Sequence, residues 1–273
     1  MKTLENQTLL YDEDCPLCNL YTTSFVKSGM LDKNGRKAYS RLSEDEQTFV
    51  DLKRAPNEIA LVDNTTKTVI YGIDSLLKVI GFSFPWIEKF GTIKSIHFIL
   101  EKLYSFISYN RKVIIPGNVN DKNKLQCTPD FNYKYRFIFI GFALTLTSFI
   151  LFGYSNLFPN LPKPNITREI ILAFGQIVFQ SLFLLKLDKK TIINYAGNLM
   201  TVSLMGSLIL VPILILNQFV NVLEFLVLGW FGITVCIMFA EHFRRIKILN
   251  LPYYLSYTWI IYRIIALLLI LNL

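Results

Sequence analysis

Residues 8–18 have the sequence TLLYDEDCPLC, which predicts a strand, a turn and the start of a helix. Its first four residues predict a buried β-strand. Pro16 suits the first turn of a following helix, where its missing N–H leaves no bond unmade. Cys15 and Cys18 would then lie at a strand-to-helix junction, where the partial positive charge of the helix N-terminus favours a thiolate. The spacing therefore indicates redox chemistry at this junction.

The Cys-x-x-Cys spacing also allows a metal site, or no chemistry at all. Tetrahedral zinc requires four ligands, and we find only Cys127 and His97 as further candidates in the polar part of the chain. The first residues have no apolar signal-peptide core, so we expect this part to stay in the cytosol, where structural disulfides are rare. We therefore favour redox chemistry and predict no metal site. Cys127 either exchanges with the pair or is an incidental cysteine.

The residues around this motif predict a small α/β domain over residues 1–113. Apolar patterns and turn residues predict strands at 8–12, 36–42, 58–62 and 67–71 and helices at 15–28, 43–53 and 75–80. Ser43 and Glu46 have the spacing of a capping box for the second helix. The order β-α-β-α-β-β-α is that of a thioredoxin-like fold, in which a Cys-x-x-Cys follows the first strand.

Residues 12–18, DEDCPLC, resemble the signature of the DCC thiol-disulfide oxidoreductase family, which is named for its Asp-x-x-Cys-x-x-Cys motif. Asp12, Cys15 and Cys18 match this motif, and the resemblance covers about residues 7–113. Two further stretches match as well: YGIDSLL at 71–77 and YNR at 109–111. The resemblance implies a thioredoxin-like domain that exchanges disulfides. A hydrophobic C-terminal region fused to such a domain is familiar in this family.

The residues of the motif suggest separate roles. Cys15 is nearer the helix start and would be the more exposed, attacking thiol, while Cys18, one turn on, would resolve the mixed disulfide. Asp12 would shuttle a proton to or from Cys18. Asp14 belongs to an acidic run that should raise the pKa of both thiols and oppose the helix dipole, so the net direction stays open. Pro56 is the candidate for the proline that faces the cysteines in thioredoxin-like sites.

The second part of the chain is a membrane domain by composition. Hydrophobic residues make up 52% of the 273 residues, which is too many for an ordinary soluble protein. A polar connector at 114–135 leads into five apolar segments, each near the roughly 20 residues that cross a hydrocarbon core. The predicted spans are 136–158, 168–187, 195–216, 222–241 and 257–272.

The distribution of charge predicts how these spans are oriented in the membrane. The net charge is +8, and from Arg136 onward ten Lys/Arg stand against four Asp/Glu. The basic residues gather before the first span, between the second and third, and between the fourth and fifth. By the positive-inside rule the N-terminus is cytoplasmic and the C-terminus is outside. Five spans suggest a bacterial inner-membrane protein, and the charge pattern does not support nucleic-acid binding.

Four polar residues near the last two spans form a candidate membrane cluster: Glu241, His242, Arg244 and Arg263. A charge inside an apolar run usually pairs or lines a cavity, and Glu241 is the candidate partner of Arg263. His242 would relay protons. The alternative is plain helix packing with interfacial anchoring by Trp and Tyr. Four further polar residues either join helices or line a small-molecule site: Gln176, Gln180, Asn198 and Glu224.

Taken together, these residues predict a membrane-anchored thiol-disulfide oxidoreductase. Its partners would be protein or small-molecule thiols and disulfides, the lipid bilayer and a membrane redox partner. Exchange itself requires no cofactor, and a quinone is one carrier that would accept electrons in the membrane. Two alternatives remain: a transporter or lipid-handling protein with a redox-sensing domain, and a scaffold whose thioredoxin-like domain is not catalytic.

Overall fold

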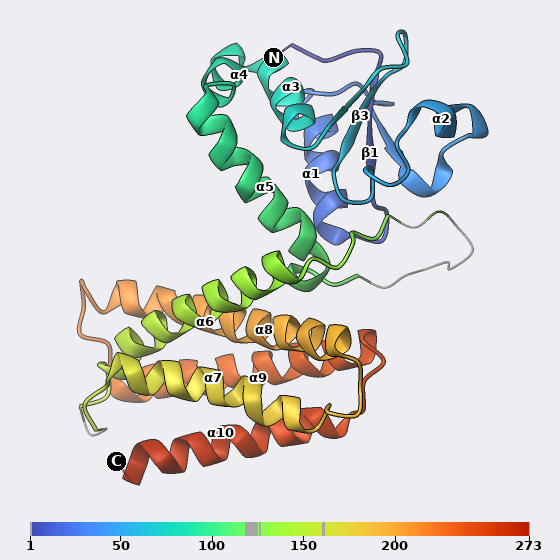
Figure 1. Ribbon diagram of the computed structural model, residues 1–273. Helices are drawn as coiled ribbons and strands as arrows, with labels where there is room; N and C mark the ends of the chain where they lie inside the picture. The colour runs from blue at the N-terminus through green and yellow to red at the C-terminus, as the bar shows by residue number, and fades with distance from the viewer. Residues whose placement is uncertain (1, 118–124, 126, 160–161, 273) are drawn as a thin grey trace. The chain divides into compact units, whose positions relative to one another are not determined.

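The computed structural model describes residues 2–117, 125, 127–159 and 162–272. The chain forms two compact units, Met1–Tyr135 and Arg136–Leu273 (Figure 1). Part of the predicted connector, residues 118–124 and 126, lies outside the described residues. A small β-sheet lies in the first unit, and the described elements of the second unit are helices. The chain is therefore an α/β part followed by a helical part.

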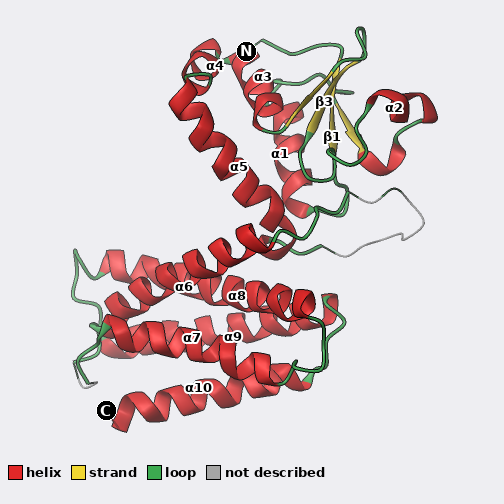
Figure 2. Ribbon diagram, in the orientation of Figure 1, coloured by secondary structure: helices red, strands yellow, loops and turns green. Residues whose placement is uncertain are grey.

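Four strands form the sheet: β1 Gln7–Tyr11, β2 Arg36–Ala38, β3 Ala60–Asp63 and β4 Val69–Tyr71. Their order in the sheet is β2-β1-β3-β4 (Figure 2). β1 pairs in parallel with β2, whereas β3 pairs antiparallel with both β1 and β4. All four predicted strands are present. The prediction that β2 continues to residue 42 is wrong, because the chain turns into a short 3-10 helix at Tyr39–Arg41 and buries Leu42 in the core.

Five helices accompany the sheet: α1 Pro16–Lys27, α2 Glu44–Phe49, α3 Ile73–Ser83, α4 Pro85–Gly91 and α5 Lys94–Ile114. The predicted capping box is confirmed, because Ser43 and Glu46 each accept a hydrogen bond from the other's backbone N–H. α2 nevertheless ends before residue 53, since the extended backbone of Val50 turns that side chain into the core. α3 does not end at residue 80 as predicted but continues to Ser83.

Side chains of the central strands alternate between the two faces of the sheet, as the two-residue period of a strand requires. On one face, Leu9 and Leu61 pack with apolar side chains from α1, α3 and α5. On the other face, Leu10 and Val62 pack with the segment 39–55 that contains α2. Figure 1 shows α1, α3 and α5 on one side of the strands and α2 on the other. β1 is covered on both faces, which fixes the position of the loop that follows it.

The second unit is built from α6 Tyr133–Ser155, which begins before its boundary, α7 Ile166–Leu182, α8 Lys189–Leu216, α9 Glu224–Ile248 and α10 Tyr254–Asn272. In the described part of the chain, α6, α8, α9 and α10 are long and apolar enough to cross a membrane. α7 has 17 residues and ends before Phe183, so it is shorter than the predicted span 168–187. Four such helices are thus present where the sequence predicts five spans.

The core of the second unit lies between α8 and its neighbours, and α8 is the most buried of the four long helices. Val202 of α8, Met238 of α9 and Trp259 of α10 belong to one buried cluster. Outward-facing positions stay apolar, and Phe225 and Leu228 of α9 are 67% and 60% exposed. A helical unit with a buried core and an apolar outer surface is suited to a lipid environment.

The capping box of α2 offers a test of the first unit. Changing Ser43→Ala removes the acceptor for the Glu46 N–H, so we expect the first unit to lose about 1 kcal/mol of unfolding free energy. Urea-dependent pulse proteolysis of the full-length protein in detergent micelles measures the loss. Thr48→Ala in the same helix keeps both box hydrogen bonds and is the matched control. Equal losses in the two variants would contradict this account of α2.

Candidate functional site

The two cysteines of the motif lie where the sequence places them, at the junction of β1 and α1. The Cys15 N–H donates to Asp12 O over 3.2 Å, and the Asn19 N–H donates to Cys15 O over 3.0 Å. Cys15 is the N-cap of α1, and Pro16 occupies its first turn as predicted. The turn that follows β1 thus leads directly into α1, and Cys18 lies in the first turn of this helix.

Both cysteines are free thiols, and both are buried. Cys15 is 0% exposed and Cys18 is 5% exposed, so the prediction that Cys15 is the more exposed thiol is wrong. The reason is that β1 is covered on both faces, which draws the loop after it into the interior. A reagent from solvent can therefore reach the Cys15 sulfur only after local movement of the residues around it.

Asp12 is buried and is paired with two cations from the last turn of α5. Its Oδ2 lies 2.9 Å from Lys112 Nζ and 3.6 Å from Arg111 Nη2, while its Oδ1 accepts from the Asp14 N–H over 3.1 Å. Neither cation is predicted from the sequence to belong to the site. Arg111 does lie in the YNR stretch of the family resemblance, which is the one signal that could have singled it out.

Arg111 connects the thiol loop to two other segments. Its Nη2 donates to Pro56 O over 2.9 Å and to Cys127 O over 2.7 Å, and its Nη1 donates to Ser108 Oγ over 3.1 Å. Pro56 therefore takes part through its carbonyl oxygen, and the described residues contain no cis peptide bond. Asp12, Pro56 and Cys127, far apart in the sequence, meet on one buried guanidinium.

The two thiols have opposite electrostatic environments. The pKa of Cys15 is lowered to about 6, chiefly because Cys18 donates a hydrogen bond to its sulfur, with a further contribution from the Arg111 cation. Burial and the Asp12 carboxylate act in the other direction on Cys15 but do not outweigh these effects. The pKa of Cys18 is raised, because its thiol is the donor in that bond and because it is buried. The favoured state is a Cys15 thiolate beside a Cys18 thiol.

A cavity of about 190 Å³ adjoins Cys18. Its polar and thiol-bearing lining is Asp12, Cys18, Ser108, Arg111 and Cys127, and most of the remaining wall is apolar or aromatic, including Tyr11, Leu17, Tyr21, Leu76 and Tyr104. Burial raises the pKa of Cys127 to about 12, so this third cysteine stays a protonated thiol at neutral pH. The cavity can hold an apolar group next to a thiol and a cation.

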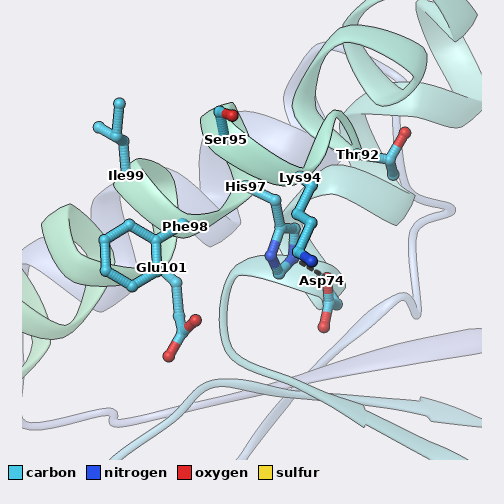
Figure 3. Close-up of a pocket in the computed structure, with 8 residues that line it drawn as sticks. All are labelled: Asp74, Thr92, Lys94, Ser95, His97, Phe98, Ile99 and Glu101. Atoms are coloured by element: carbon cyan, nitrogen blue, oxygen red, sulfur yellow. Dashed lines mark hydrogen bonds and ion pairs between the residues drawn. The ribbon is translucent and has the colours of Figure 1, made fainter.

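A second hollow of about 920 Å³ lies on the surface of the first unit, around the start of α5. Figure 3 shows His97 pointing to Asp74, with Nε2 and Oδ1 2.8 Å apart. Its lining comes from α3, from α5 and from Thr92 before α5, and none of its residues lines the thiol cavity. Among the described residues no group of three or more His, Cys, Asp and Glu side chains is placed to share a metal ion.

The polar residues predicted in the membrane unit divide into two groups. Glu241 binds Arg244 over 2.7 Å and Arg245 over 2.8 Å, so the predicted Glu241–Arg263 pair is wrong. The cations at the third and fourth positions along the same helix are the nearer partners. Arg263 instead lies over the Trp259 ring, 4.8 Å from its centroid. α9 also continues to Ile248, so Glu241 lies inside the helix rather than at its end.

His242 belongs to a buried hydrogen-bonded chain across four helices. Its Nε2 is 3.0 Å from Tyr195 Oη, and its Nδ1 is 3.2 Å from Ser256 Oγ. Tyr195 Oη and Thr258 Oγ1 both donate to Gln180 Oε1, over 3.1 and 3.2 Å. These bonds hold α7, α8, α9 and α10 together. Gln180 and His242 therefore have a structural role in this unit.

No protein-family model, curated protein or solved structure matches this chain.

The pH dependence of Cys15 reactivity tests the electrostatics of this site. In reduced full-length protein, we expect Cys15 alkylation by iodoacetamide to rise through about pH 6, because the thiolate is the reactive form and its pKa is lowered from 9.0 to about 6. Cys18→Ala removes the hydrogen bond and should shift the midpoint upward. Peptide mass spectrometry follows Cys15 alone. Cys127→Ser is the matched control with little shift, and a wild-type midpoint near 9.0 would contradict the assignment.

Proposed function

We propose that this protein is a membrane-anchored thiol-disulfide oxidoreductase that acts through Cys15 and Cys18. The observation that carries the proposal is the geometry at the start of α1, where the buried thiols Cys15 and Cys18 lie one turn apart and Cys18 shares a cavity wall with Arg111. The lowered pKa of Cys15 and the raised pKa of Cys18 agree with it. A thiolate attacks a disulfide, and a neighbouring protonated thiol completes the exchange, so the pair has the two states that the reaction needs.

The reaction balances with these two residues alone. The Cys15 thiolate attacks one sulfur of a substrate disulfide, the other sulfur leaves as a thiolate, and a mixed disulfide forms. Cys18 then loses its proton, attacks Cys15 and releases the second substrate thiolate. Two electrons pass from the dithiol to the substrate, and the Cys15–Cys18 disulfide forms. Asp12 is a buried carboxylate on the same loop and lines the same cavity as Cys18, and we assign it the transfer of the Cys18 proton.

The proposal includes a thioredoxin-like fold for the first unit and membership of the DCC family. The strand order β2-β1-β3-β4, with β1 and β2 parallel and the other neighbours antiparallel, supports a thioredoxin-like domain. The Asp-x-x-Cys-x-x-Cys match at residues 12–18 supports membership of the DCC family. The structure adds that the Arg of the YNR stretch, Arg111, lies at the thiol site. This contact gives the downstream match a physical reason.

The cavity beside Cys18 supports a substrate with an apolar group next to its disulfide. Such a group would fill the cavity and pack against its aromatic wall, and Arg111 would attract a negative charge on the substrate. The membrane unit would hold this exchange at the bilayer surface, with the thiol domain in the cytoplasm. A membrane redox partner or a quinone would then return the electrons.

Trapping of mixed disulfides tests the proposal. In the full-length protein, Cys18→Ser should accumulate mixed disulfides at Cys15, because the resolving thiol is gone while the attacking one remains. Non-reducing gels and mass spectrometry measure the trapped species. Cys15→Ser is the matched control, and we expect at least tenfold less trapping in it.

Each other outcome of this experiment has a definite meaning. If Cys15→Ser traps and Cys18→Ser does not, Cys18 is the attacking thiol, as its place in the cavity wall would allow. If neither variant traps a partner under oxidising conditions, thiol exchange is not the function. The double variant Cys15→Ser with Cys18→Ser gives the background.

The number of membrane crossings gives a separate prediction. At 1.5 Å per residue, the 17 residues of α7 are about 26 Å long, close to a hydrocarbon core of about 30 Å. We propose that α7 crosses with the other four helices, which places the C-terminus opposite the cytoplasmic N-terminus. Alkaline phosphatase fused to the C-terminus in bacterial cells should be active, and green fluorescent protein should be dark. The reverse pattern would show four crossings.

A further inference from the structure

α7 and α10 are in contact near Gly175 and Gln176 of α7 and Arg263 of α10. Tyr262 Oη donates to Leu172 O over 2.6 Å, which joins the two helices. A Cβ on Gly175 would lie 2.5 Å from the same Tyr262 hydroxyl, so the glycine permits this close approach. Gln176 and Arg263 directly follow these two residues in the chain. They therefore lie at one level of the helix pair.

Arg263 has no carboxylate partner among the described residues. Glu241 is held by Arg244 and Arg245, and Glu169 lies 2.7 Å from Arg168. The described contact of the Arg263 guanidinium is the Trp259 ring. Arg263 is the tenth residue of α10, near the middle of a helix long enough to cross a membrane. A charge at this depth normally pairs or lines a site.

Four buried hydrogen-bond donors on α7 and α10 have no acceptor in the described part of the chain: Gln176 Nε2, Gln180 Nε2, Trp259 Nε1 and Arg263 Nε. Gln176, Gln180 and Trp259 are each at most 3% exposed. Gln176 and Gln180 are one turn apart on α7, and Trp259 and Arg263 are one turn apart on α10, so each pair shares a helix face. Buried polar groups are nearly always paired, so four unpaired donors need an explanation.

The chemical types of these four donors indicate what kind of ligand would bind them. Trp and Arg side chains can only donate, so the ligand must supply acceptors. Arg263 adds a positive charge that a neutral carbonyl compound would leave uncompensated. Carboxylate and phosphate oxygens meet both requirements. Around the cluster, α7 and α10 expose apolar side chains to the lipid side, including Phe174 and Ile264 at 57% and 53%.

We propose that α7 and α10 form a binding site for an amphiphile with an anionic oxygen headgroup, such as a fatty acid or a lysophosphatidate. The headgroup contacts Arg263, Gln176 and the indole N–H of Trp259. The hydrocarbon chain lies along the exposed apolar faces of the two helices. This site belongs to the membrane unit and does not depend on Cys15 or Cys18.

Fluorescence quenching of Trp259 tests the site in the full-length protein. The chain has three tryptophans, and Trp86→Phe with Trp230→Phe leaves Trp259 as the single emitter. In neutral detergent, 9,10-dibromostearate should quench this emission saturably, and the matching dibromostearyl alcohol should not. Arg263→Gln should raise the half-saturating concentration at least tenfold. Arg244→Gln, which removes an exposed arginine paired with Glu241, is the matched control and should change it less than twofold.

Competition identifies the source of the anionic group. Displacement of dibromostearate by oleate assigns a carboxylate ligand, and displacement by oleoyl-lysophosphatidate assigns a phosphate ligand. Equal quenching by the alcohol, or an unchanged half-saturation in Arg263→Gln, would overturn the proposal. Arg263→Lys keeps the charge and should retain most of the binding, which separates a lost site from a misfolded variant. Binding should also persist when both Cys15 and Cys18 are serine.

Discussion

The buried guanidinium of Arg111 is the constraint on which the thiol site depends. A charge removed from water must be matched by partners, and Arg111 finds them in the carboxylate of Asp12 and the carbonyl oxygens of Pro56 and Cys127. These contacts tie the end of α5 to the loop after β1 and to the segment before β3. The same positive charge lowers the pKa of Cys15. One residue therefore supports both the packing of the loop and the reactivity of the thiol.

The acidic run before the cysteines has a different effect from the one its charges suggest. Asp12 would oppose a thiolate if it were alone, but it is paired with Arg111 and Lys112. The Glu13 carboxylate has a different partner, because the Ser40 hydroxyl donates a hydrogen bond to it over 2.5 Å. The hydrogen bond between the cysteines and the cation from α5 outweigh the remaining repulsion at Cys15. The acidic residues therefore recruit positive charge to the loop that holds the thiols.

The sequence predicts features that depend on neighbouring residues. The strand-to-helix junction, the capping box of Ser43 and Glu46, and the β3–β4 hairpin all follow from residues a few positions apart. Long-range contacts do not follow in this way. Arg111 meets Asp12 across 99 positions, and no local pattern indicates that pairing. The predicted pair of Arg263 and Glu241 is wrong for a related reason: Arg244 and Arg245 lie nearer to Glu241 on the same helix.

The thiol loop and the Arg111 cation that contributes to the lowered pKa of Cys15 are made at different times. Cys15 and Cys18 leave the ribosome near the start of synthesis, whereas Arg111 and Cys127 follow about a hundred residues later, at roughly 5–20 residues per second. Before α5 docks, Asp12 has neither Arg111 nor Lys112 beside it. The Cys15 sulfur then lacks the contribution of the Arg111 cation to its lowered pKa. The electrostatic environment of Cys15 is therefore complete only after α5 has been made and has docked.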